Sequence, residues 1–150
     1  MKTVYFLPLF FLLFGNDPHP KKAESCKPAA RFSSSEIEEV SPLEERASSN
    51  FEVYVRNTGD CVWKKADVHI EVKVITKPPR VSFSTASVFK ERVKHQMYND
   101  NIEKGKNGIF KIRFDPVPVP GQYGLQFTMK YKNQTLASAN KYLKCEDYSN

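Results

Sequence analysis

Apolar and polar residues alternate along much of this chain, and a period of two is the pattern of a half-buried β-strand. The alternation is clearest at residues 68–74, where His69, Glu71 and Lys73 separate four apolar residues. Polar, Gly- and Pro-containing stretches such as residues 57–60 and 78–79 end the runs as turns. The period, or a weaker form of it, predicts seven strands, at residues 31–40, 51–55, 68–74, 92–98, 110–114, 123–131 and 136–145.

About seven short strands and no long helix predict an all-β fold, an immunoglobulin-like sandwich of two sheets. An antibody-type domain is not expected, because the strands at residues 51–55 and 123–131 lack the cysteine pair of that class. The sandwich would occupy residues 31–145 as a single domain. An extended, proline-containing arm precedes it at residues 16–30, and a polar C-terminal tail follows at residues 146–150.

The first fifteen residues have the pattern of a secretory signal peptide. Lys2 precedes an apolar run at residues 4–14 that is too short to span a bilayer, and Gly15 is small enough for a cleavage site. We expect residues 1–15 to be removed and the mature protein to be secreted, with a buried first strand as the alternative. We expect no transmembrane anchor and no lipid-anchor signal in the remaining sequence.

The amino-acid composition excludes several classes of protein. The 150 residues are 40% hydrophobic and 27% charged, which excludes full disorder, a collagen and a polytopic membrane protein. The 23 Lys and Arg residues outnumber the 17 Asp and Glu residues, for a net charge of +6. Because the basic residues are spread along the chain, they are interpreted as solvated outer faces. The sharper alternative is a positive surface that steers an anionic partner such as a sulfated glycan; nucleic acid is not expected for an exported chain.

The sequence contains no recognisable catalytic motif. His19, His69 and His95 are scattered, and neither a nucleophile elbow nor a phosphate-binding glycine loop is present. The three cysteines lack metal-ligand spacing, so no metal and no cofactor are predicted. The protein is therefore not expected to be an enzyme.

One N-glycosylation sequon is present, at Asn133-Gln134-Thr135. It falls in a predicted turn between two strands, where a glycan is tolerated. We predict a glycan on Asn133, with an unoccupied sequon as the alternative.

The C-terminal half resembles a filamin-type immunoglobulin repeat. The resemblance is carried by Asn107-Gly108-Ile109-Phe110 opening one strand, Gly121-Gln122-Tyr123 opening the next, and a short hairpin at residues 132–136. Ser138 and Tyr142 match the last strand of the family, but Ala139 replaces its proline. The match extends over residues 32–144 and is most specific at residues 107–144. A second resemblance, through residues 57–63 and 120–123, is to the Trp-containing immunoglobulin-like domain of autophagy receptors, an intracellular family with the same fold.

Export makes a disulfide reasonable, and three cysteines allow one internal bridge. In the sandwich topology the first strand starts at the end that holds the loop with Cys61, whereas the last strand finishes at the opposite end with Cys145. Cys26–Cys61 is therefore the first choice. It leaves Cys145 as a thiol or for a bond to a partner chain, and Cys26–Cys145 stays open as the alternative.

The filamin-type resemblance implies a binding role at a sheet edge formed by the third and fourth strands, where a partner strand could add by backbone pairing. Trp63 would belong to a second surface at the end loops, or else anchor the core. The candidate binding residues are Trp63, Val68, Ile70, Val72, Val74, Arg92 and Lys94.

Together these features predict a secreted, single-domain binding module for extracellular or cell-surface protein recognition. The alternative function is a secreted carrier of a lipid or small hydrophobic ligand, held between the aromatic-rich inner faces of the sheets. A third interpretation, a subunit of an extracellular assembly, would use Cys145 for a covalent partner.

Overall fold

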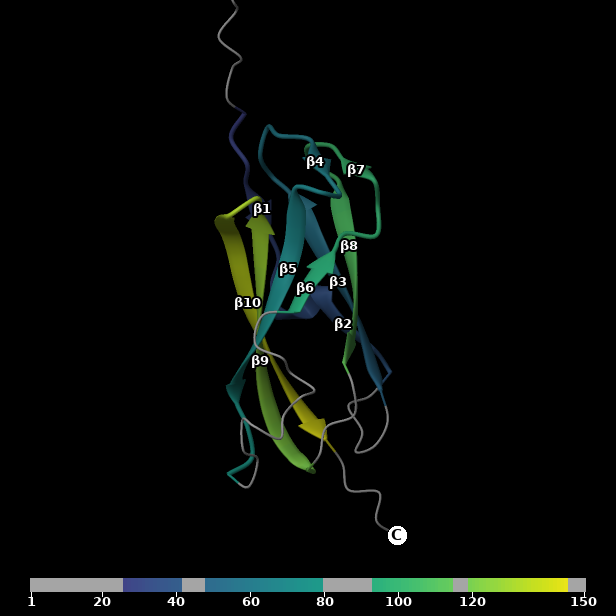
Figure 1. Ribbon diagram of the computed structural model, residues 1–150, viewed down its shortest axis with the longest axis vertical. Coiled ribbons are helices and arrows are strands. Elements are labelled where there is room, and N and C mark those ends of the chain that lie inside the picture. The colour runs from purple at the N-terminus through teal and green to yellow at the C-terminus, as the bar shows by residue number, and fades with distance from the viewer. Residues whose placement is uncertain (1–25, 42–47, 80–92, 115–118, 146–150) are drawn as a thin grey trace, which may run out of the picture.

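A computed structural model describes residues 26–41, 48–79, 93–114 and 119–145 (Figure 1). The predicted signal peptide, the tail at residues 146–150 and Arg92 lie outside these residues. The elements are β1 Ala30–Arg31, the 3-10 turn η1 Ser34–Glu36, β2 Ile37–Ser41, β3 Ser49–Asn57, β4 Trp63–Lys64, β5 Val68–Thr76, β6 Val93–Gln96, β7 Asn101–Ile102, β8 Asn107–Phe114, β9 Gly121–Tyr131 and β10 Gln134–Cys145.

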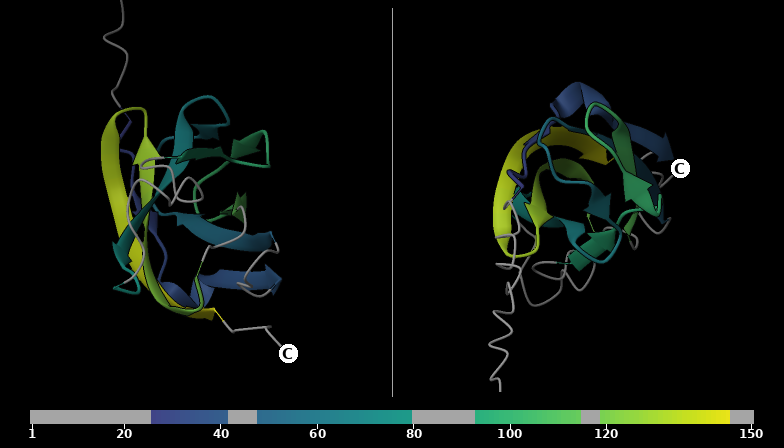
Figure 2. Two further views of the ribbon diagram at one scale, coloured as in Figure 1. Left: turned by 60° about the horizontal axis from the view of Figure 1, so that its bottom comes forward. Right: turned by 90° about the horizontal axis from the view of Figure 1, so that it is seen from above.

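The strands form two antiparallel sheets and a small extra pair. In the first sheet β3 is central, with β8 on one edge and β1 followed by β2 on the other. The second sheet has the order β10-β9-β5-β6, and β4 pairs with β7 at one end of the molecule. Seen from the other directions, the sheets curve around a common interior (Figure 2). The predicted all-β, immunoglobulin-like sandwich is confirmed.

The predicted first strand at residues 31–40 is divided by η1. Ser33 and Glu36 form a capping box: the Ser33 backbone N–H donates to Glu36 Oε2 at 2.6 Å, and the Ser33 hydroxyl donates to the same oxygen. This local alternative to the ladder interrupts the pairing with β3. β1 and β2 are therefore two short strands along one edge of β3.

The inward residues of both sheets form the core, as the alternation predicts. Phe51 of β3 packs edge-on against Phe114 of β8, with ring centroids 5.2 Å apart. The Phe51 ring also lies 6.5 Å from that of Phe127 on β9, across the space between the sheets. These three rings therefore meet in the space between the two sheets.

The described part of the N-terminal arm, residues 26–30, is fastened to the loop after β3. A disulfide joins Cys26 to Cys61, with Cα atoms 5.0 Å apart, so the first-choice pairing is confirmed. Backbone hydrogen bonds from Gly59 N to Ala29 O (3.1 Å) and from Asp60 N to Lys27 O (2.9 Å) hold the same contact. Cys145, at the end of β10, is only 2% exposed, so a bond to a partner chain would require this end to move.

The predicted sheet edge is only half correct. β5 is an internal strand, because it pairs with β9 on one side and with β6 on the other. Of the two predicted strands, only β6 lies at an edge of this sheet as the described residues form it. The sequence pattern predicted both strands but could not show which one was covered.

Candidate functional site

Most of the predicted binding residues are in the core. Trp63 and Ile70 are 0% exposed, and Val68 and Val72 are also buried. The prediction that they form a contact surface was wrong, because the apolar set of an alternating strand faces the opposite sheet. Val74 is half-buried.

Two further predicted residues, Arg92 and Lys94, stay predictions, because the structure describes neither side chain. Arg92 lies outside the described residues, and for Lys94 only the backbone position in β6 is described. Trp63 takes the core-anchor role that was its alternative.

The exposed face of the first sheet presents a more informative set of side chains. We call it the β3–β8 face and define it by its outward residues, which the strand register places in four rows. Tyr98 joins the second row because its backbone N–H donates to Ile109 O at 2.7 Å. From the upper end to the lower end in Figure 1, the rows are Arg31-Arg56-Asn107, Tyr54-Ile109-Tyr98, Glu38-Glu52-Lys111 and Ser41-Asn50-Arg113.

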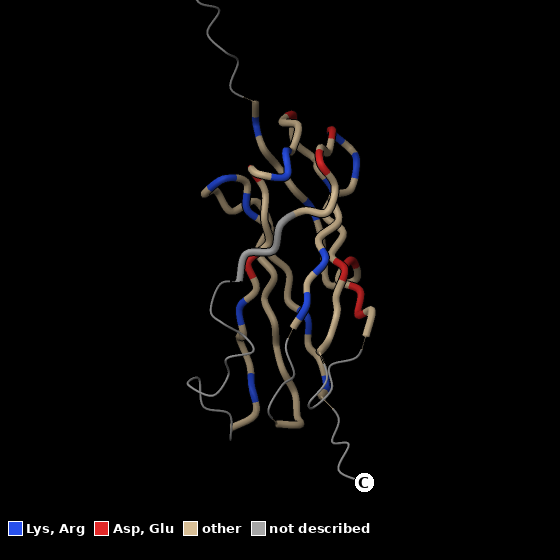
Figure 3. Tube along the Cα trace, turned by 45° about the vertical axis from the view of Figure 1, so that its right-hand side comes forward, with Lys and Arg blue, Asp and Glu red and all other residues tan. Residues whose placement is uncertain are grey.

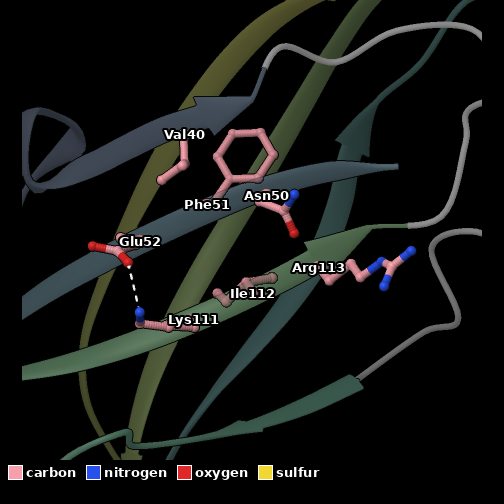
Figure 4. Close-up of a pocket in the computed structure, with 7 residues that line it drawn as sticks. All are labelled: Val40, Asn50, Phe51, Glu52, Lys111, Ile112 and Arg113. Carbon is pink, nitrogen blue, oxygen red and sulfur yellow. Dashed lines mark ion pairs between the residues drawn. The ribbon is translucent and has the colours of Figure 1, made fainter. Parts of the chain in front are cut away.

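The lower end of this face holds an open hollow of about 280 Å³ (Figure 4). Its side-chain walls come from three strands: Val40 of β2, Asn50 and Glu52 of β3, and Lys111 and Arg113 of β8. The neighbouring side chains of β3 and β8 are buried on the core side, so the floor is the strand backbone. The hollow is large enough to accept one side chain of a partner.

A chain of polar contacts crosses the middle of the face. The Tyr54 hydroxyl donates to Glu52 Oε2 at 2.7 Å, and Lys111 Nζ lies 3.2 Å from Glu52 Oε1. Lys111 Nζ also lies 4.7 Å from the centroid of the Tyr98 ring, a cation–π contact. Glu52 is thus held between a phenol and an ammonium group.

These contacts fix the protonation states. The Tyr54 hydroxyl and then Lys111 lower the pKa of Glu52, and the hydrogen bond to Glu52 raises the pKa of Tyr54 to about 12. At neutral pH Tyr54 is therefore a neutral donor and Glu52 a carboxylate. Neither group is suited to proton transfer near pH 7.

Two large apolar side chains are exposed beside this polar centre. Val40 on β2 is 61% exposed, and Tyr98 beyond β8 is 63% exposed. They flank the charged row on opposite sides. Exposed apolar residues around a few fixed polar groups are typical of recognition surfaces.

The exposed face of the second sheet is mainly polar. Lys130 Nζ lies 2.9 Å and His69 Nε2 3.5 Å from the Glu71 carboxylate. The hydrogen bond from Lys130 is the largest cause of the lowered pKa of Glu71. Tyr142, 66% exposed, covers Gly124, where a Cβ atom would lie 3.0 Å from the tyrosine ring.

Asn133 is exposed in the two-residue turn between β9 and β10. It lies at the rim of a second open hollow, of about 290 Å³, beside Lys65 and Lys132. The predicted surface position of the sequon is confirmed. Occupancy stays a prediction.

The part of the chain that the structure describes contains no group of three His, Cys, Asp or Glu side chains that could hold a metal ion. No helix among these residues is long and apolar enough to cross a membrane. Lys and Arg are distributed over strands as well as loops (Figure 3).

No protein-family model and no curated protein sequence matches the chain. Among solved structures, it is similar to the solution structure of a CARDB domain from Pyrococcus furiosus, with 12% identity and a TM-score of 0.51 over 79% of this chain and 94% of that domain. A crystal structure of a CARDB domain from the same organism, with di-metal ions, has 11% identity and a TM-score of 0.49 over 82% and 90%. A β-glucosidase from Kluyveromyces marxianus has 16% identity and a TM-score of 0.48 over 81% of this chain and 15% of the enzyme. At this identity the first likeness shows the fold, and the chain is a small all-β, immunoglobulin-like domain.

Proposed function

We propose that this protein is a secreted binding module that recognises an extracellular or cell-surface protein through the β3–β8 face. The observation that carries the proposal is the exposure of Val40 and Tyr98 on either side of the Glu52–Lys111 pair. The adjacent hollow can receive one side chain, and the ion pair would fix the orientation of a partner. The filamin-type resemblance implied a sheet edge for this role, whereas the exposed side chains favour a sheet face.

Binding to intact cells tests this proposal. The mature protein, labelled and purified from secreting mammalian cells, would be compared by flow cytometry with the variant Val40→Asp/Tyr98→Asp. We expect the variant to lose at least tenfold in affinity, because a desolvated carboxylate opposes burial of an apolar contact. Unchanged circular dichroism would show that the variant is folded.

The matched control is Tyr142→Asp, a change of the same kind at a tyrosine of similar exposure on the other sheet. This control should bind the cells with the same affinity as the protein without substitutions. Equal losses in both variants, or no loss in the double variant, would reject the β3–β8 face as the recognition surface.

The secretory route has its own test. The Cys26–Cys61 disulfide is compatible with an oxidising compartment. The N-terminal sequence of protein from the medium should start at Asn16. Glycosidase treatment should increase the electrophoretic mobility of the protein without substitutions but not that of the Asn133→Gln variant. Retention of the protein inside the cell would contradict secretion.

The carrier interpretation is tested on the same preparation. Mass spectrometry of organic extracts should find no stoichiometric lipid, because aromatic side chains meet between the sheets. One equivalent of bound lipid per protein would favour the carrier function over the binding module.

A further inference from the structure

Two arginines lie directly opposite each other at the upper end of the β3–β8 face. Arg31 of β1 is the cross-strand partner of Arg56 on β3, and Arg56 is in turn the partner of Asn107 on β8. Directly opposed residues project to the same side with Cβ atoms about 4.5–5.5 Å apart. Both arginines are exposed, and their neighbours Phe32 and Val55 are buried, so the whole row points to solvent.

This arrangement carries concentrated positive charge. Like charges directly opposite each other destabilise a sheet. No described carboxylate forms an ion pair with Arg31 or Arg56. Glu36 is near enough for Arg31 to contribute to its lowered pKa, but the backbone N–H and hydroxyl of Ser33 already bind its carboxylate. The row therefore offers two guanidinium groups and an amide to an outside anion.

The next row supplies a different kind of surface. Tyr54 and Ile109 are half-buried cross-strand partners directly below Arg56 and Asn107. An aromatic ring beside an aliphatic side chain can pack against the C–H face of a sugar. Guanidinium forks match the oxygens of sulfate as they match those of phosphate and carboxylate.

We infer that the Arg31-Arg56-Asn107 row binds a sulfate group of a sulfated glycan, with the attached sugar ring against Tyr54 and Ile109. Glu38 and Glu52 on the same face would be repelled by an anionic membrane, whereas a linear glycan can cross the face along one row. The inference is independent of the protein partner proposed above, because it uses neither Val40 nor the hollow.

The test uses the full secreted protein and a heparin-derived hexasaccharide as the probe. Calorimetry at low salt should show binding that weakens as ionic strength rises. Arg31→Gln/Arg56→Gln should weaken the affinity for the hexasaccharide at least tenfold. Arg31→Lys/Arg56→Lys should bind with intermediate affinity, because lysine keeps the positive charge but cannot form the two parallel hydrogen bonds of a guanidinium group. The glutamine variant should keep or raise the melting temperature, since a like-charge contact is removed.

The matched control is Lys64→Gln/Lys65→Gln, which removes the same charge from exposed residues at the β4–β5 end. It should change affinity less than twofold. If the arginine variant and the lysine control lose affinity equally, binding depends only on net charge and the inference is wrong. Equal affinity for the sulfated and the desulfated hexasaccharide would also overturn it. Binding to phosphatidylserine vesicles without binding to the hexasaccharide would also overturn it. Val40→Asp alone, at the lower end of the face, should still bind the hexasaccharide, which separates this inference from the proposed function.

Discussion

At the scale of single residues, Asn57 shows how polar groups organise the upper end of the core. It is fully buried, and its amide donates to Cys61 O at 2.7 Å and to Ile102 O at 3.0 Å. Its side-chain oxygen accepts from Gly59 N at 3.1 Å. Asn57 therefore ties the loop that carries the disulfide to β7. Sequence analysis placed it only in a turn, because nothing in the pattern separates a buried asparagine from an exposed one.

We predict that Asn57→Ala lowers the free energy of unfolding by about 1–3 kcal/mol, because buried carbonyl groups lose their donors. Urea denaturation monitored by circular dichroism would measure it. Asn50→Ala, an exposed residue on the same strand, should cost much less. Equal losses would show that the buried hydrogen bonds of Asn57 contribute little.

Glu71 makes stability depend on pH. Its folded pKa is lowered, chiefly by Lys130, so its contribution is present above the ordinary carboxyl pKa and is lost as pH falls through the folded value. Glu71→Gln should lower stability at pH 7 by about 0.5–1 kcal/mol, and the difference should vanish in acid. Denaturation at a series of pH values tests this, with Lys73→Gln as a control on the same strand face. A difference that persists at low pH would indicate lost packing instead of lost charge.

At the scale of elements, the strands with clear alternation could be predicted from the sequence. β5, β8 and β9 appear where the period of two placed them, because half-burial imposes that period. β4 and β7 were not predicted. They are two residues long, and a period needs several repeats to be visible.

The contact between the arm and the loop after β3 requires a glycine. A Cβ atom on Gly59 would lie 2.4 Å from both Ala29 N and Lys27 O, which are backbone atoms. We predict that Gly59→Ala costs about 1–3 kcal/mol of stability by pushing the arm away. Thermal unfolding would measure the loss. Gly105→Ala, which has positive φ and open space, should show the smaller cost of backbone strain alone. A larger loss of stability for Gly105→Ala than for Gly59→Ala would contradict the close contact between Gly59 and the arm.

At the scale of the whole molecule, the disulfide fastens the chain's described N-terminal end to the sandwich. The bridged cysteines are 35 residues apart, and a loop of this length corresponds to about 3–4 kcal/mol of stabilisation in the chain-entropy model. Cys26→Ser/Cys61→Ser should lose stability on that scale in urea. Non-reducing peptide mapping should find the Cys26–Cys61 peptide and native protection of buried Cys145 from alkylation. A Cys26–Cys145 peptide would contradict the structure.

The sequence alone determined the longer strands and their alternating apolar and polar residues, and it favoured the Cys26–Cys61 bridge while leaving Cys26–Cys145 open. Each follows from local period or from the order of strands in a sandwich. Which outward residues gather on one face was decided only by the tertiary structure. Arg31 meets Arg56, and Tyr98 lies beside Ile109, through pairings between strands distant along the chain. Strand register sets these neighbours. The register depends on how the two sheets pack together, so it cannot be predicted from the pattern along a single strand.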